Sequence, residues 1–142
     1  MTKIIFFCIF SFVFSSYYQD VKKHKWENRV LLVFTHIKND EIFNKQISNL
    51  LKEKKGLTER KLIIYQFVKD QYSINFDSKW LLSSLKKRNY KAESENFKVV
   101  LIGLDGGVKL EQTSFLSTKK LFTIIDGMPM RRNEIRNEIR NK

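Results

Sequence analysis

Residues 29–35 read Arg-Val-Leu-Leu-Val-Phe-Thr, an almost unbroken run of β-branched, aliphatic and aromatic side chains. Such a run without polar alternation is typical of a strand buried on both faces of a parallel sheet. Asn39 and Asp40 follow the run and can cap a helix, and Gly56 is expected to supply its left-handed exit. The apolar residues between them that recur at helical spacing are Phe43, Ile47, Leu50 and Leu51. The stretch therefore predicts a central strand followed by an amphipathic crossover helix.

Further elements follow in the same way. Residues 61–68 have the composition of a second strand, and Asp77 or Ser78 then caps a predicted helix that ends at the basic residues 86–88. The apolar face of that helix consists of Leu81, Leu82 and Leu85. A third strand is predicted over residues 97–104.

The last third of the chain contains a turn signal and a helix. Residues 105–107, Asp-Gly-Gly, predict a tight hairpin, with a short fourth strand over 108–110. Thr118 caps a final helix, which Pro129 stops or kinks. Its apolar side consists of Leu121, Phe122, Ile125 and Met128.

The predicted element order is βαβαββα. A strand, helix, strand connection forms a right-handed parallel unit, and the terminal hairpin and helix complete a four-stranded mixed sheet with helices on both faces. This α/β topology is that of the thioredoxin-like fold. A flavodoxin-like sheet fits less well, because no further strand and helix remain to supply a fifth parallel strand.

The chain is strongly basic, with 27 Lys and Arg against 15 Asp and Glu in 142 residues and a formal charge of +12. This balance predicts attraction to polyanions such as nucleic acid, lipid headgroups or acidic glycans. The basic runs are spread along the chain, so a solvated basic surface is the alternative interpretation.

The amino terminus has the pattern of a secretory signal peptide over residues 1–16. Lys3 precedes the uncharged apolar run 4–14, and Ser15 or Ser16 offers the cleavage position. The prediction is export to the periplasm or the extracellular space, with no transmembrane span after cleavage. The alternatives are an uncleaved anchor and a buried first strand. Cleavage would remove Cys8, the only cysteine, and leave a mature chain without thiol or disulfide.

The reactive thiol of a thioredoxin-like fold lies where the first strand meets its helix. Residues 35–40 contain no cysteine there, and residues 93–96, before the third strand, contain no proline. Thiol exchange and cysteine-based peroxide reduction are therefore excluded for the mature chain. His36 and Asp40 are candidates for binding or proton transfer, although a plain loop histidine and a helix-start aspartate are the simpler interpretation. No metal site or cofactor is predicted.

The carboxyl tail repeats Arg-Asn-Glu-Ile at residues 132–135 and 136–139, and Arg140 follows. Its arginines at positions 132, 136 and 140 lie one helical turn apart, which is consistent with an anion-binding strip or with a solvated or docking helix. We expect a thioredoxin-like domain over residues 26–130 and a basic helix or tail over 131–142.

One known family is similar to this chain. The similarity rests on residues 97–110, Phe-Lys-Val-Val-Leu-Ile-Gly-Leu-Asp-Gly-Gly-Val-Lys-Leu, on residues 121–122, Leu-Phe, and on residues 125–134, Ile-Asp-Gly-Met-Pro-Met-Arg-Arg-Asn-Glu. From about residue 26 to residue 136 the chain resembles a domain of unassigned function found in short exported bacterial proteins. The domain also occurs in animal sushi-repeat-containing proteins and in a related coiled-coil-domain matrix protein. The resemblance implies a peroxiredoxin-related fold without the redox cysteine, in a secreted setting, and it assigns no catalytic residue.

Two functions are compatible with the sequence. The first is an exported binding module for an anionic glycan, a lipid headgroup or a protein, with His36, Asp40, Arg131 and Arg132 as candidate binding residues. The alternative is a non-thiol enzyme that acts on an anionic substrate near the start of the first helix. Nucleic acid fits the charge, but it conflicts with export and with the lack of an aromatic and basic recognition motif.

Overall fold

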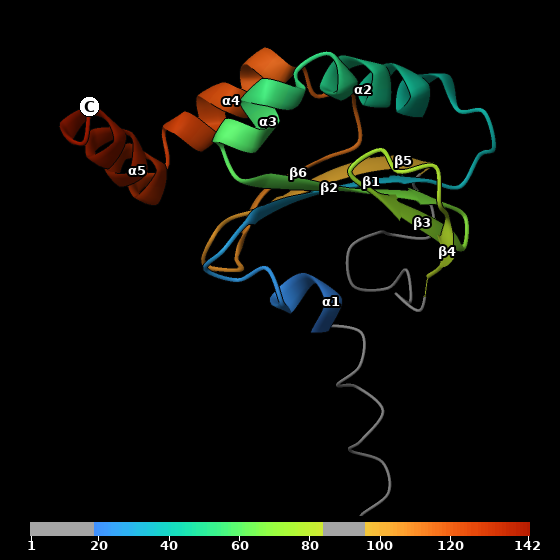
Figure 1. Cartoon of the computed structure of the whole chain (residues 1–142). Coiled ribbons are helices and arrows are strands. Elements are labelled where there is room, and N and C mark those ends of the chain that lie inside the picture. The colour runs from blue at the N-terminus through green and yellow to red at the C-terminus, as the bar shows by residue number, and fades with distance from the viewer. Residues whose placement is uncertain (1–18, 84–95) are drawn as a thin grey trace, which may run out of the picture.

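A mixed sheet forms the centre of the computed structural model, which describes residues 19–83 and 96–142 (Figure 1). The sheet has six strands in the order β4-β3-β2-β1-β5-β6. Strands β1 and β2 are parallel, and every other neighbouring pair is antiparallel. The strands are β1 (Arg29–Thr35), β2 (Leu62–Val68), β3 (Gln71–Ile74), β4 (Leu81–Leu82), β5 (Phe97–Ile102) and β6 (Val108–Gln112).

The predicted four strands are the β2-β1-β5-β6 portion of this sheet, and all seven residues of β1 are buried as expected. The prediction of four strands was nevertheless wrong, because β3 and β4 extend the edge beside β2. The turn from β2 to β3 was not predictable, because its left-handed position (φ 53°) is occupied by Lys69 and not by a glycine.

The helix predicted from Asp77 or Ser78 was also wrong over its described part. Leu81 pairs with Tyr72 and Leu82 with Gln71, so these leucines form strand β4. Adjacent leucines satisfy a short strand as well as a helix, and the edge of β3 offered backbone partners. The rest of the predicted helix, including residues 85–88, lies outside the described residues.

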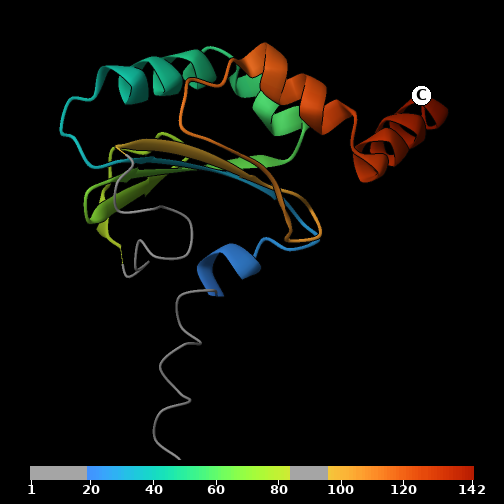
Figure 2. The ribbon, with the colours of Figure 1, turned by 180° about the vertical axis from the view of Figure 1, so that it is seen from behind.

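Helices occupy both faces of the sheet, as predicted (Figures 1 and 2). Helices α2 (Glu41–Leu51), α3 (Lys54–Glu59) and α4 (Thr118–Asp126) lie on one face, and the short α1 (Gln19–Lys22) lies on the other. Helix α5 (Pro129–Arg140) follows α4 and projects from one end of the molecule. Alternate residues of β1 divide the core, because Leu31 and Val33 pack toward α2 to α4 while Leu32 and Phe34 pack on the α1 side.

The helix after β1 does not run on to Gly56. Helix α2 ends at its C-cap, Lys52, and Gly56 lies inside α3 without the predicted left-handed conformation. An added Cβ at Gly56 would lie 2.7 Å from Cε2 of Phe122 on α4. The glycine therefore permits a close approach of α3 to α4 and ends no helix.

The predicted hairpin is confirmed between β5 and β6. Gly106 has φ +80°, and its N–H donates to the carbonyl of Gly103. The Asp105 carboxylate accepts hydrogen bonds from Lys109 Nζ at 2.7 Å and from the Gly107 N–H at 3.0 Å. These bonds, that of Lys109 foremost, lower the pKa of Asp105 below its ordinary value.

Candidate functional site

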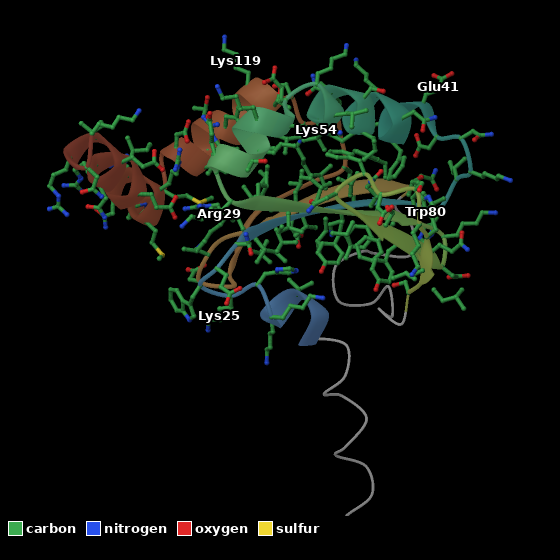
Figure 3. The ribbon with its side chains drawn as sticks, in the orientation of Figure 1. Lys25, Arg29, Glu41, Lys54, Trp80 and Lys119 are labelled. Carbon is green, nitrogen blue, oxygen red and sulfur yellow. The ribbon has the colours of Figure 1, made fainter. Side chains whose placement is uncertain are left out.

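The four candidate residues lie at opposite ends of β1. His36 and Asp40 follow its last residue, whereas Arg131 on α5 shares the carboxylate of Glu134 with Arg29, the first residue of β1. A seven-residue strand spans roughly 20 Å. Figure 3 shows the same separation, with Arg29 near α5 and Glu41, the neighbour of Asp40, at the far end. The structure therefore does not bring the four residues into one site.

Asp40 is the N-cap of α2, as the sequence predicted. Its Oδ1 accepts from the backbone N–H groups of Ile42 (2.9 Å) and Phe43 (3.3 Å). Its Oδ2 accepts from the Thr35 hydroxyl at 2.7 Å. Both oxygens are engaged by the chain itself, so the carboxylate joins the end of β1 to the start of α2.

His36 lies half-buried beside this cap, and its backbone N–H donates to the carbonyl of Asn96 at 3.1 Å. The other histidine, His24, is 2.8 Å from the Tyr65 hydroxyl through Nε2. Over residues 19–83 and 96–142, no group of three His, Cys, Asp or Glu side chains is placed to hold a metal ion. A role for His36 in binding or proton transfer stays a prediction.

Arg131 lies on the inner side of α5 and is only 6% exposed. Its Nη1 lies 3.3 Å from Glu134 and 3.4 Å from Glu138, and its Nε lies 3.5 Å from Asp126. Burial by itself lowers the pKa of Arg131, but the three carboxylates outweigh that effect and raise it. The side chain is thus a fully charged internal partner of acidic residues from its own chain.

Two further arginines complete this cluster. Arg29 is fully buried, and its guanidinium donates to Glu134 at 3.3 to 3.4 Å and to the Arg60 carbonyl at 3.0 Å. Arg60 binds Asp126 in a bidentate manner, at 3.0 and 2.7 Å, and lies 4.0 Å from the centre of the Phe122 ring. The six residues form the arginine–carboxylate network of Arg29, Arg60, Arg131, Asp126, Glu134 and Glu138. The network fastens α5 to α4, α3 and the start of β1.

The outer side of α5 has the opposite character. Its exposed guanidinium groups make no ion pair within the described residues, and they belong to Arg132, Arg136 and Arg140. Arg136 donates to Asn133 at 2.7 Å, and Arg140 donates to Asn137 at 3.3 Å. These four side chains line a hollow of about 470 Å³. We call Arg132, Asn133, Arg136, Asn137 and Arg140 the arginine strip.

Sequence reasoning treated Arg131 and Arg132 as a pair, but the structure separates them. Neighbouring residues of a helix point about 100° apart, so one lies in the network and the other in the strip. Arg29 was not recognised as a functional residue. Its signal was present, since it is the one charged residue of the run 29–35.

No helix within residues 19–83 and 96–142 has the length and hydropathy required to cross a membrane. The predicted signal peptide, residues 1–16, and Cys8 lie outside the described residues.

Comparisons with known proteins agree with this architecture. The sequence model of the family described as "Domain of unknown function (DUF4174)" matches residues 20–134. The crystal structure of the reduced 2-Cys peroxiredoxin of Plasmodium vivax is similar, with a TM-score of 0.55 and 19% sequence identity over 80% of this chain and 83% of that one. At this identity the similarity shows the thioredoxin-like fold alone. No curated protein matches the chain. The single cysteine, Cys8, lies before the span that the family model matches.

Proposed function

The chain belongs to the DUF4174 family, and from that premise we propose that it is an exported binding module that holds an anionic partner on the arginine strip of α5. The observation that carries this proposal is the separation of charge on one helix. Both acidic residues of α5, Glu134 and Glu138, contact Arg131 on the inner side. The outer arginines are left without an acidic neighbour among the described residues.

The strip suits an extended partner with several negative charges. Its three arginines follow one another at four-residue spacing, and each step advances about 6 Å along the helix axis. The cations therefore cover roughly 12 Å, a length that favours a polymer over a single small anion. Binding would also relieve the mutual repulsion of like charges at this spacing.

The side chains of the strip favour an acidic glycan among the anionic partners. Guanidinium groups pair with carboxylates or sulfates, while the neighbouring amides of Asn133 and Asn137 can donate to and accept from sugar hydroxyls. A helix that inserts into a lipid surface carries an apolar face beside its cations. The exposed large apolar side chains of α5 are Met130 and Ile139, which do not form such a face.

The position at the end of β1 supports binding over catalysis. Residues 35–40 contain no cysteine, and both oxygens of Asp40 already accept hydrogen bonds from the chain. The alternative of a non-thiol enzyme therefore depends on His36. Loss of a measured turnover in His36→Ala, with α5 binding intact, would favour that alternative.

The test of the strip is binding to hyaluronan and heparin, which carry carboxylates and sulfates. The variant Arg132→Gln/Arg136→Gln/Arg140→Gln removes the strip, and Lys52→Gln/Lys79→Gln/Lys119→Gln removes the same charge from exposed positions outside α5. Each exposed ion contact contributes up to about 1 kcal/mol, so the strip variant should bind roughly tenfold to a hundredfold more weakly. The control variant should stay within about threefold, and the affinity should fall with salt.

Equal losses in both variants would contradict the proposal, because they would show a response to net charge alone. Strip-dependent binding to anionic lipid vesicles or to duplex DNA, without glycan binding, would replace the glycan as partner.

Export is tested by fractionation and intact mass. We expect loss of the first 15 or 16 residues, and a full-length cytoplasmic protein would refute that part.

A further inference from the structure

A second cavity, which shares no lining residue with the hollow of the arginine strip, lies where α3 meets the beginning of β2. Its volume is about 500 Å³. We propose that this cavity binds a small amphiphilic anion, a carboxylate carried on an apolar chain. The residues that line it are Asn28, Lys54, Leu57, Thr58, Lys61, Leu62, Ile63, Ile64, Asn75 and Phe76.

The floor of the cavity is part of the main core. Leu57, Leu62 and Ile64 are buried members of the cluster between the sheet and helices α2 to α4, and Phe76 packs against that cluster. An apolar chain placed here would cover surface that belongs to the core. Small-molecule sites are commonly of this size and are lined mainly by such side chains.

The cavity exists because β3 does not extend alongside the first residues of β2. Strand β3 pairs with β2 only from Tyr65 to Val68. Asn75 adds one further pair of hydrogen bonds to the edge of β2. Its N–H donates to the Ile64 carbonyl at 2.9 Å, and its Oδ1 accepts from the Ile64 N–H at 3.0 Å. On the β3 side of Leu62, no described strand continues the sheet, whereas β1 pairs with Leu62 on the other side. The space next to this sheet edge is therefore open to a ligand.

The polar groups around the opening are hydrogen-bond donors. The ammonium groups of Lys54 and Lys61 make no ion pair with the described residues, and no acidic side chain lines the cavity. Among the described residues, no side-chain hydrogen bond is made by Asn28. The Asn75 oxygen accepts from Ile64, which leaves the amide N–H groups of Asn75 for a ligand. Two cations and two amides without an acidic neighbour favour a ligand whose head is an anionic acceptor.

The backbone holds these groups in place at a local energetic cost. Three lining residues adopt left-handed conformations without being glycine: Lys61 (φ 49°), Asn75 (φ 49°) and Phe76 (φ 65°). Residues other than glycine are strained in this conformation, and such strain clusters at active sites and ligand-binding sites. Lys54 Nζ also lies 6.0 Å from the centre of the Phe76 ring, so a cation and an aromatic side chain meet at the cavity.

The test uses decanoate as the probe and the full chain, by calorimetric titration and by NMR shift mapping. Lys54→Gln/Lys61→Gln should weaken binding about tenfold or more. Its matched control, Lys52→Gln/Lys55→Gln, removes two exposed charges that do not line the cavity and should stay within about twofold. Thr58→Trp fills the cavity from the exposed side of α3, and it should abolish binding while the thermal midpoint stays near that of the wild type.

Several results would overturn the proposal. These are unchanged binding in Thr58→Trp, equal weakening in the lysine control, or binding of decanol as tight as that of decanoate. The inference stands apart from the arginine strip. The cavity variants should retain binding to hyaluronan, and the strip variant should retain binding to decanoate, so failure of one proposal leaves the other to be judged on its own.

Discussion

Replacement of Glu134 by glutamine should loosen α5 and destabilise the whole domain. The carboxylate is 17% exposed and neutralises the fully buried guanidinium of Arg29. Removal of one partner from a buried ion pair costs about 3–5 kcal/mol, because the other charge remains buried without compensation. Glutamine retains an oxygen acceptor and the site is partly open, so we expect about 3 kcal/mol. For a domain of this size the thermal midpoint should fall by roughly 10 °C.

The matched control is Glu138→Gln, which removes the same charge one helical turn later. Glu138 is 61% exposed, and within the described residues its one ion pair is with Arg131, at 3.4 Å, so its loss should cost no more than about 1 kcal/mol. Urea unfolding followed by circular dichroism measures both values. The reasoning would be refuted if the two variants were equally stable. Arg29→Met combined with Glu134→Leu should recover most of the loss, since Arg29 Nε is buried without a hydrogen bond even in the native protein.

Three other outcomes are expected. Asp40→Ala removes the α2 cap and should cost about 1 kcal/mol in thermal unfolding, whereas Asp40→Asn should cost less; equal costs would contradict the capping role. Gly56→Ala places a methyl group against Phe122 and should cost about 1–3 kcal/mol, whereas Gly127→Ala, whose nearest contact would be 3.4 Å, should stay within about 0.5 kcal/mol; the reverse order would refute the contact. The lowered pKa of Asp105 stabilises the β5–β6 hairpin above the ordinary aspartate pKa, and this contribution is lost as pH falls through the lowered value. A carboxyl-carbon NMR titration should find the midpoint below that of a free aspartate, and a midpoint at the free value would contradict the assignment.

The central strands were predictable because strands buried on both faces consist almost entirely of apolar residues. Residues 29–35 lack polar alternation, and all of them are buried between two layers. The β5 to β6 hairpin was equally clear, since Gly106 occupies a conformation that few other residues tolerate. Strands β3 and β4 escaped prediction because β3 is only four residues long and Lys69 makes the turn before it. The formation of a short edge strand depends on the strand beside it, and the local pattern of apolar residues does not show which strand that is.

The sequence predicted the place of candidate residues in helices better than it predicted a binding site. Asp40 was correctly expected at the start of a helix, and the hydrogen bond from Thr35 adds a contact across the loop that no spacing rule supplies. The cavity at α3 could not be predicted, because it depends on where β3 stops pairing with β2. Lys54 and Asn75 are distant in sequence and share a cavity only after that edge has formed.

The orientation of α5 shows where local pattern ends and tertiary structure begins. At about 100° per residue, positions 131, 134 and 138 fall on one side of the helix, and 132, 136 and 140 fall on another. The sequence therefore separates the acidic residues from three arginines before any tertiary contact forms. Which side turns inward depends on Arg29, which contacts Glu134 across 105 positions of the chain. A buried guanidinium at the start of β1 requires a carboxylate, and the inward turn of the acidic side leaves the arginines facing outward. The arginine strip is thus a consequence of satisfying a buried charge, and replacement of Arg29 should disturb the strip although Arg29 lies outside it.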